Sequence, residues 1–176
     1  MALVTQVAVF HNKRAFDQLV REYQSPVRRF LLSQTLGNEA LTDDLAQDTF
    51  IKAYTHIGQY RGTSSFLTWL TRIAYNVFYD YQRKEKQDQS LSSLSNRPDV
   101  SPVAKQETSP LKMDLYAALA ILKEEERTCI TLQLIDGYAI DEIADIMKMP
   151  TGTVKSHLKR GKDKIANYLR QNGYDR

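Results

Sequence analysis

Four side chains near the C-terminal end of the sequence have the types and the spacing that suit contacts with DNA. Lys155, Ser156, Lys159 and Arg160 follow a turn and lie within six positions of one another. At 100° per residue they fan out on one side of a helix, with Gly152 above them. Lysine and arginine bind phosphate oxygens, and hydrogen-bonding side chains bind base edges in the major groove. The pattern therefore predicts a DNA-recognition helix.

A helix, a turn and a second helix must position these side chains, between residues 137 and 169. The first helix is predicted over residues 140–148, where apolar residues recur at three- and four-residue steps. Pro150 ends it, since a residue before proline avoids the α region, and Thr151 is expected to cap the second helix. The predicted apolar face of the second helix consists of Val154, Leu158, Gly161 and Ile165. This is the outline of a helix-turn-helix unit, although an ordinary helical hairpin with a solvated charged face has the same periodicity.

Charge is concentrated locally in this part of the chain, although the net charge of all 176 residues is only +3. Six lysines and arginines stand against one acid between residues 148 and 164, whereas seven acids stand against one arginine between residues 124 and 145. A protein of low net charge that binds nucleic acid needs such a basic patch. The C-terminal unit is therefore expected to have an acidic side and a basic recognition helix.

The rest of the sequence has the periodicity of amphipathic helices and predicts an all-α protein of two small helical domains. Helices are expected over residues 1–10, 12–35, 39–57, 65–86, 113–122 and 124–135. Pro26 predicts a kink or break in the second of them. Residues 88–112, which are rich in serine and hold three of the five prolines, predict a flexible linker between domains at 1–87 and 113–176.

Two of these helices have unusual outer faces. The outer face of residues 39–57 combines acids with an isoleucine, which suits a protein partner better than DNA; its members are Asp44, Gln47, Asp48 and Ile51. The outer face of residues 65–86 interleaves aromatic side chains with arginine and asparagine; its members are Thr68, Arg72, Tyr75, Asn76, Tyr79 and Arg83. Rings stack on unpaired bases and guanidinium groups bind phosphate. Packing of Tyr75 and Tyr79 against the protein explains the same spacing equally well.

Nothing in the sequence has the spacing of an enzyme site. The three histidines, His11, His56 and His157, are far apart, and no glycine-rich phosphate loop, nucleophile elbow or Cys/His metal motif occurs. We therefore expect no catalytic residue, no cofactor and no metal. Cys129, the only cysteine, is expected to be a small buried hydrophobe. No segment is long and apolar enough to span a membrane, and we expect a cytoplasmic protein without membrane insertion.

Stretches from both halves of the chain resemble the ECF (extracytoplasmic function, group IV) sigma factors of bacterial RNA polymerase, in the sigma-70 superfamily. In the first half they are AFDQLVREY, DDLAQDTFIKAY and YRGTSSFLTWLTRIAYNVFYDYQRK; in the second they are RTCITLQLIDGYAIDEIADIM and PTGTVKSHLKRGKDKI. Their order and spacing extend the resemblance over residues 14–169. It implies that the first domain is sigma region 2 and that the second is the helix-turn-helix domain of sigma region 4.

The resemblance also implies roles for single residues. The residues that it assigns to core polymerase are Asp44, Gln47, Asp48 and Ile51. Those that it assigns to recognition and melting of the −10 element are Tyr60, Arg61, Thr68, Arg72, Tyr75, Asn76, Tyr79 and Arg83. Those that it assigns to the −35 element are Thr153, Lys155, Ser156, Lys159 and Arg160. Trp69 is expected to lie mostly in the core, and His157 is expected on the flank of the recognition helix, with a phosphate contact as its role.

The implied function is that of a sigma factor, which catalyses nothing and gives core RNA polymerase its promoter specificity. The implied partners are core polymerase, duplex −35 DNA, single-stranded −10 DNA and an anti-sigma factor. A stand-alone helix-turn-helix regulator is the alternative, but it would leave the acidic helix unexplained. A factor that binds polymerase without initiating is a third interpretation. The chain departs from the family pattern at Ala139, where the family usually has a serine that caps the first helix of the hairpin. Alanine at a cap position lowers helix stability by about 1 kcal/mol.

Overall fold

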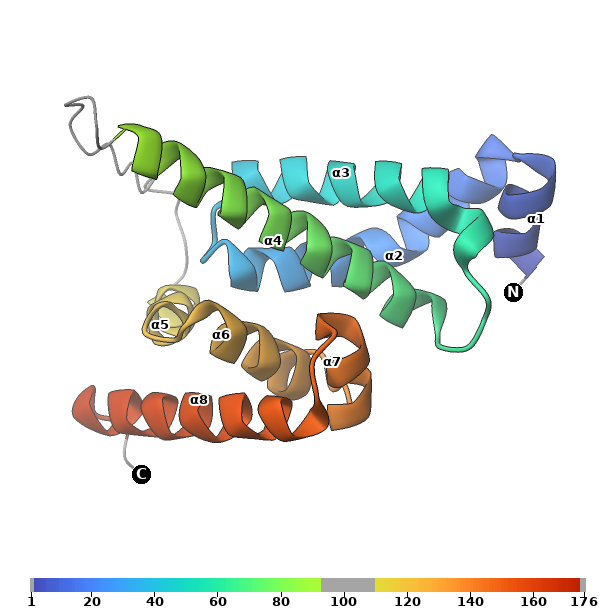
Figure 1. Ribbon diagram of the computed structural model, residues 1–176. Coiled ribbons are helices and arrows are strands. Elements are labelled where there is room, and N and C mark those ends of the chain that lie inside the picture. The colour runs from blue at the N-terminus through green and yellow to red at the C-terminus, as the bar shows by residue number, and fades with distance from the viewer. Residues whose placement is uncertain (1, 93–109, 175–176) are drawn as a thin grey trace.

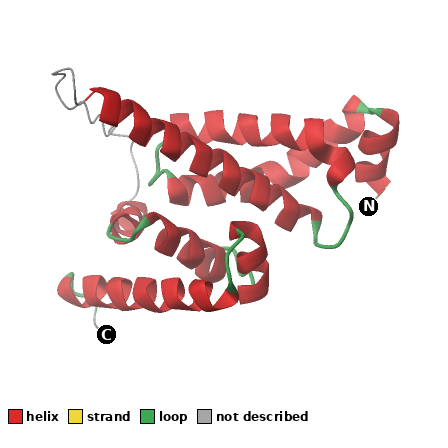
Figure 2. Cartoon of the chain, viewed as in Figure 1, coloured by secondary structure: helices red, strands yellow, loops and turns green. Residues whose placement is uncertain are grey.

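The computed structural model describes residues 2–92 and 110–174, and every regular element in these ranges is helical (Figures 1 and 2). The helices are α1 (Ala2–Phe10), α2 (Lys13–Gln34), α3 (Glu39–His56), α4 (Phe66–Ser92), α5 (Pro110–Ala120), α6 (Glu124–Ile130), α7 (Ile140–Met147) and α8 (Thr151–Gln171). A 3-10 turn, Ile57–Gln59, follows α3, and a π-helical turn, Thr131–Ile135, follows α6. The predicted all-α fold class is confirmed.

Helices α1–α4 form the N-terminal half, in which α2, α3 and α4 pack against one another. The side chain of Asn12 caps α2 by accepting the N–H of Ala15 at 3.2 Å, and Asn38 caps α3 by accepting the N–H of Leu41 at 3.1 Å. Helix α2 continues through Pro26, so of the predicted kink or break the break is wrong. Proline removes one backbone hydrogen bond and its ring crowds the preceding turn, but Val27, Phe30 and Leu31, which follow it in α2, are buried, and this packing holds the helix together.

Helices α5–α8 form the C-terminal half, in which α6, α7 and α8 enclose a second group of buried side chains. Lys148 adopts a left-handed conformation with φ of 54° and ends α7. Pro150 has the extended backbone of a cap residue, so α8 begins at Thr151 itself and no side chain caps it. The prediction that Thr151 caps this helix is therefore wrong, because Pro150 already takes the cap position.

Helical structure enters both ends of the segment that was expected to be a linker. Helix α4 continues to Ser92, and α5 begins at Pro110. Both extensions lie within residues 88–112, and residues 93–109 of that segment lie outside the described part of the chain. The proposed domain boundaries therefore cut through helices at both ends.

The two halves pack against each other, with α2 and α4 lying beside α6 and α7 (Figure 1). The contact includes a buried polar pair: the hydroxyl of Thr128 in α6 donates to the side-chain oxygen of Gln34 in α2 at 2.9 Å. Arg127 donates to the backbone carbonyl of Gln34 at 3.2 Å, and the hydroxyls of Thr71 and Tyr138 are 2.9 Å apart. Buried polar groups require such partners, so this contact has the character of a specific interface.

Candidate nucleic-acid interface

Helix α8 buries one face against α6 and α7 and leaves the opposite face in solvent. Its buried residues are Val154, Leu158 and Gly161, as predicted, and Ile165 is half-buried. The five side chains predicted to contact −35 DNA are all exposed: Thr153, Lys155, Ser156, Lys159 and Arg160. In this structure the hydroxyl of Ser156 donates to the backbone carbonyl of Gly152 at 3.0 Å, so only its lone pairs remain available to accept hydrogen bonds.

The absence of a side chain at Gly161 brings α8 close to α6. A Cβ at this position would lie 2.8 Å from Cγ1 of Ile130, which is itself buried. Non-bonded carbon atoms pack at an optimal distance of about 3.5–4.0 Å. Gly161 therefore sets the distance between the recognition helix and the helix that supports it.

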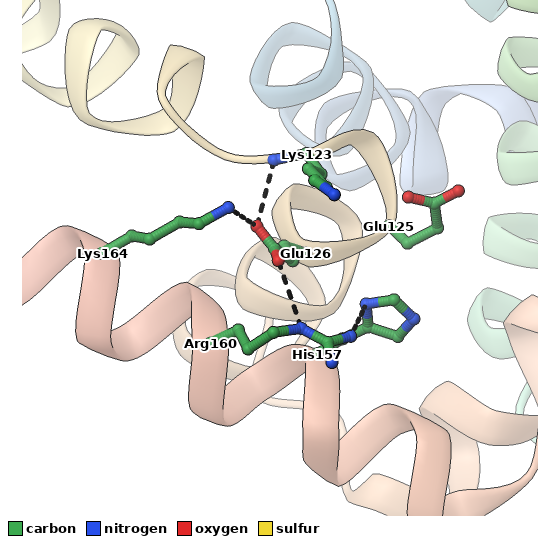
Figure 3. A pocket seen from close by; sticks show the side chains of 6 residues that line it. All are labelled: Lys123, Glu125, Glu126, His157, Arg160 and Lys164. Carbon is green, nitrogen blue, oxygen red and sulfur yellow. Dashed lines mark hydrogen bonds and ion pairs between the residues drawn. The ribbon is translucent and has the colours of Figure 1, made fainter.

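One residue that sequence reasoning missed lies beneath this helix. Glu126 of α6 is 1 % exposed, and Lys164 and Arg160 of α8 converge on its carboxylate (Figure 3). The sequence shows only a run of three glutamates at residues 124–126, which suggested charge at a helix start. Nothing in that run indicates which glutamate turns inward, because the choice depends on where α8 packs.

The predicted −10 face lies on α4 and on the loop before it. Asn76, Tyr79 and Arg83 are exposed, whereas Arg72 and Tyr75 are half-buried. Thr68 differs from these residues: it is 1 % exposed, its hydroxyl lies 2.8 Å from that of Ser65, and its N–H donates to the same Ser65 oxygen at 3.0 Å. Thr68 thus belongs to the capping turn of α4 and is buried in this structure, whereas a contact with DNA would require it to be accessible.

The loop before α4 is held by aromatic packing. The hydroxyl of Tyr60 donates to the carbonyl of Ser64 at 2.7 Å, and its ring packs against those of Phe66 and Trp69, with centroids 5.4 and 5.6 Å away. Trp69 is half-buried in this cluster, so it lies at the edge of the core. Arg61, the residue after Tyr60, is exposed.

Acidic residues of the C-terminal half lie against the α4 face. Arg72 forms an ion pair with Asp145 of α7, and Lys86 donates to Glu124 of α6 at 2.8 Å. Burial, with added negative charge from Tyr79 and α6, raises the pKa of Tyr75 to about 12. The ring of Tyr79 lies 6.1 Å from that of Tyr75 and is 47 % exposed. Part of the predicted −10 face is thus engaged within the chain itself.

The predicted polymerase-binding face of α3 is free of these contacts. Asp44, Gln47, Asp48 and Ile51 are all exposed, and the side chain of Ile51 is 55 % accessible. Figure 1 shows α3 on the side of the N-terminal half that is remote from α8. Singly exposed apolar side chains are common on soluble proteins, so the use of this face of α3 for binding polymerase stays a prediction.

Metal-binding clusters and reactive thiols would indicate a different chemistry. Across residues 2–92 and 110–174, no group of three or more His, Cys, Asp and Glu side chains is arranged to hold a metal. Cys129 is buried as predicted, and burial raises the pKa of its thiol to about 12, which makes it a poor nucleophile. No helix in the same ranges is long and apolar enough to cross a bilayer.

Comparisons with known proteins match both halves. Residues 19–87 match the family model Sigma-70 region 2, and residues 112–165 match Sigma-70, region 4. The ECF RNA polymerase sigma-E factor of Haemophilus influenzae is 33% identical over 170 residues, which cover 90% of this chain and 89% of that protein. The RNA polymerase sigma-H factor of Pseudomonas aeruginosa is 31% identical over 179 residues, with coverage of 90% and 88%.

A solved structure has a similar arrangement of helices. The sigma factor RpoE from Bartonella quintana, solved in complex with the anti-sigma factor NepR, superimposes with a TM-score of 0.74 at 26% identity, over 92% of this chain and 98% of that one. The two family models together cover most of the chain, and the curated relatives cover nearly all of it. The chain therefore belongs to the ECF sigma factors of the sigma-70 family, which are initiation factors and not enzymes, and it directs promoter-specific transcription initiation by RNA polymerase.

Proposed function

We propose that three exposed faces divide the work of initiation between them. The acidic face of α3 docks on core polymerase, the face of α4 that carries Asn76 and Tyr79 captures −10 bases, and the basic face of α8 binds the −35 duplex. The observation that carries this division is their separation: each face lies on its own helix, with its own chemistry, around one folded chain (Figure 1). At the −35 element, phosphate contacts provide affinity and contacts to base edges provide sequence specificity.

The −10 side acts on unpaired bases. Flipping a base out of the duplex costs a few kcal/mol, and stacking on an aromatic ring returns about 1–3 kcal/mol per base. The exposed ring of Tyr79 and the amide of Asn76 lie one turn of α4 apart and are suited to stacking and to edge recognition. The cost of flipping and the gain from stacking are thus nearly equal, and the contacts of the whole polymerase shift the equilibrium toward the open duplex.

The two halves of the chain separate before the −10 face is used. Arg72 is paired with Asp145 of α7, and Tyr75 is half-buried within electrostatic reach of α6, in the structure of the free chain; DNA requires the same side chains. We expect core polymerase, bound to α3, to hold the halves apart. The neighbouring structure from Bartonella quintana contains an anti-sigma factor, and we extend that partnership to this chain: an anti-sigma factor keeps the protein from polymerase until a signal arrives.

Transcription by a reconstituted holoenzyme tests this function. The purified chain is mixed with bacterial core polymerase and a library of promoter fragments from a bacterial genome, and the start sites of the transcripts are sequenced. We expect transcripts that share two motifs, at −10 and −35, and that disappear without the chain. Transcripts without a shared −35 motif would contradict the role of α8. A chain that binds duplex DNA tightly by itself as a dimer, and yields no transcripts, would support the stand-alone regulator instead.

A further inference from the structure

The guanidinium group of Arg160 is held on two sides by neighbouring residues. Its Nε lies 3.4 Å from Oε1 of Glu126, and one Nη lies 3.1 Å from Nδ1 of His157 (Figure 3). Arginine has only donors, so the imidazole nitrogen is the acceptor of this hydrogen bond. More than half of the arginine side chain stays exposed. The group is therefore fixed in orientation without being covered.

Glu126 is the centre of this arrangement. Its side chain is 2 % exposed, and its Oε2 accepts from Nζ of Lys164 at 2.6 Å and from the backbone N–H of Lys123 at 3.2 Å. Burial acts to raise the pKa of Glu126, but the hydrogen bonds and the charges of Lys164 and Arg160 outweigh it and lower the pKa below its ordinary value. The carboxylate therefore remains ionised at neutral pH.

A buried, paired carboxylate of this kind is not explained by a gain in folding stability alone. Removing a charge from water is expensive, and a buried ion pair is often replaced by apolar side chains without loss of stability. The Glu126 network occupies the edge of α8 where Arg160, one turn after Ser156, enters the exposed face. The opposite edge, which carries Lys155 and Lys162, faces a separate shallow cavity of about 340 Å³. In the part of the chain that the structure describes, the ion pairs of this helix lie on the Glu126 edge.

We propose that Glu126 and His157 are positioning residues for sequence choice at the −35 element, because they orient the guanidinium of Arg160 toward base edges. This inference rests on the proposed function of α8. Bidentate contacts of arginine to a base require a fixed direction of approach. An arginine released from the network reaches phosphates instead and binds all sequences alike. His157 then acts through Arg160, and a phosphate contact is not its main role.

Binding measurements on matched variants test the proposal. Wild-type holoenzyme first selects a −35 sequence from a pool of random duplexes; the probes are that duplex and a shuffled duplex of the same composition. The affinity ratio of the two probes is measured for wild type, Glu126→Gln, His157→Phe and Arg160→Ala. Glu125→Gln is the control, because it removes the same charge from the next position, where the side chain lies outside the network (Figure 3).

We expect Arg160→Ala and Glu126→Gln each to lower the affinity ratio about tenfold, and His157→Phe to lower it about threefold. The shuffled duplex should bind Glu126→Gln as tightly as wild type or more tightly, and Glu125→Gln should keep the wild-type ratio. A ratio within about twofold of wild type for folded Glu126→Gln, or an equal loss in Glu125→Gln, overturns the proposal. So does an unchanged ratio for Arg160→Ala.

Two further outcomes are separable from these. If Glu126→Gln loses its helical circular dichroism, His157→Phe decides the question, because His157 lies at the surface edge and leaves the bonds of Glu126 to Lys164 and Lys123 intact. If wild-type holoenzyme selects no sequence at all, the proposed function fails, and the positioning role fails with it. Normal selection by wild type together with unaltered variants contradicts the positioning role alone.

Discussion

Arg72 of α4 forms an ion pair with Asp145 of α7, and this pair joins the face predicted to melt DNA to the half of the chain predicted to position it. The other oxygen of Asp145 accepts from Lys148 at 3.0 Å, so the carboxylate is shared between the two halves. The side chain of Asp145 is 48 % exposed and that of Arg72 is 24 % exposed. The pair therefore lies at the rim of the interface, where water and competing phosphates can reach it.

Asp145→Asn should loosen the contact between the halves. A partly exposed ion pair contributes about 0.2–1 kcal/mol, so its loss should shift the ratio of closed to open chains by up to about fivefold. Spin labels at cysteines introduced in place of Lys84 and Ala166, both exposed, would report the distance between α4 and α8. We expect a larger population at long distance in Asp145→Asn than in wild type.

Asp141→Asn is the matched control for that change. Asp141 is an exposed acid of the same helix, and no ion pair involves it in the part of the chain that the structure describes. It should leave the distance distribution unaltered. Equal effects of the two substitutions would show that net charge, and not the pair with Arg72, holds the halves together.

Asn76→Ala should impair promoter opening more than promoter binding. Asn76 is exposed on α4, and its amide is the group suited to the edge of an unstacked base. Permanganate footprints on a promoter recovered by the holoenzyme should weaken several-fold, while the amount of closed complex stays near the wild-type level. Gln82→Ala removes an amide from another face of α4 and serves as the control. Footprints of wild-type strength in Asn76→Ala would contradict the role given to it.

Helix positions and exposed faces could be predicted from the sequence because local patterns determine them. The predicted helix over residues 140–148 is observed as α7, and the apolar face of α8 was correct at Val154, Leu158 and Gly161. Asparagine caps and the 3.6-residue period need only nearby residues. The errors at Pro26 and Thr151 share a cause: a local signal that the neighbouring packing or the adjacent proline overruled.

The contact between the halves could not be predicted in this way. Gln34 and Thr128 are 94 positions apart, and neither side chain differs from the many polar residues on helix surfaces. The burial of Thr68 and the inward turn of Glu126 are further cases, because each depends on which helix packs beside it. The exposure of a candidate site can be predicted from the pattern of a single helix. The residues that contact the site can be identified only once the whole fold is known.

Glu126 should give the stability of the chain a characteristic pH dependence. Its pKa is lower in the folded chain than its ordinary value, so the folded state favours the ionised form. Its stabilisation is complete above the pKa of the unfolded chain and is lost as the pH falls through the folded pKa. Thermal unfolding should show Glu126→Gln about 1–3 kcal/mol less stable than wild type at neutral pH, with a difference that shrinks at acidic pH. A difference that is constant with pH would assign the loss to packing instead.

Ala139→Ser should stabilise the helix-turn-helix unit. Ala139 has the extended backbone of a cap residue, and its N–H already donates to Glu142 at 3.0 Å, but it offers no side-chain acceptor to the first turn of α7. A serine hydroxyl would supply that acceptor and add about 0.5–1 kcal/mol to the free energy of unfolding. Ala166→Ser, on an exposed stretch of α8, should instead be neutral or slightly destabilising. Equal responses at both sites would rule out capping as the cause.

Gly161→Ala should be destabilising even though alanine is the better helix former. Alanine favours a helix interior over glycine by about 1 kcal/mol, but the added Cβ would lie 2.8 Å from Cγ1 and 3.2 Å from Cδ1 of buried Ile130. Overpacking of a core typically costs about 1–3 kcal/mol, so we expect a net loss of about 1 kcal/mol in urea unfolding. Gly152→Ala, in the same helix, meets no atom within 4 Å and should be neutral or stabilising.

A double-mutant cycle identifies Ile130 as the cause of that loss. Ile130→Ala alone should cost about 2–4 kcal/mol, because it leaves a cavity between α6 and α8. In Ile130→Ala/Gly161→Ala the new methyl group enters that cavity. The double variant should therefore lose less unfolding free energy than the two single variants together, by about 1 kcal/mol or more. Additive losses would mean that α8 moves away from α6 as a unit. In that case −35 binding should weaken in Gly161→Ala as well, because the network at Glu126 would be pulled apart.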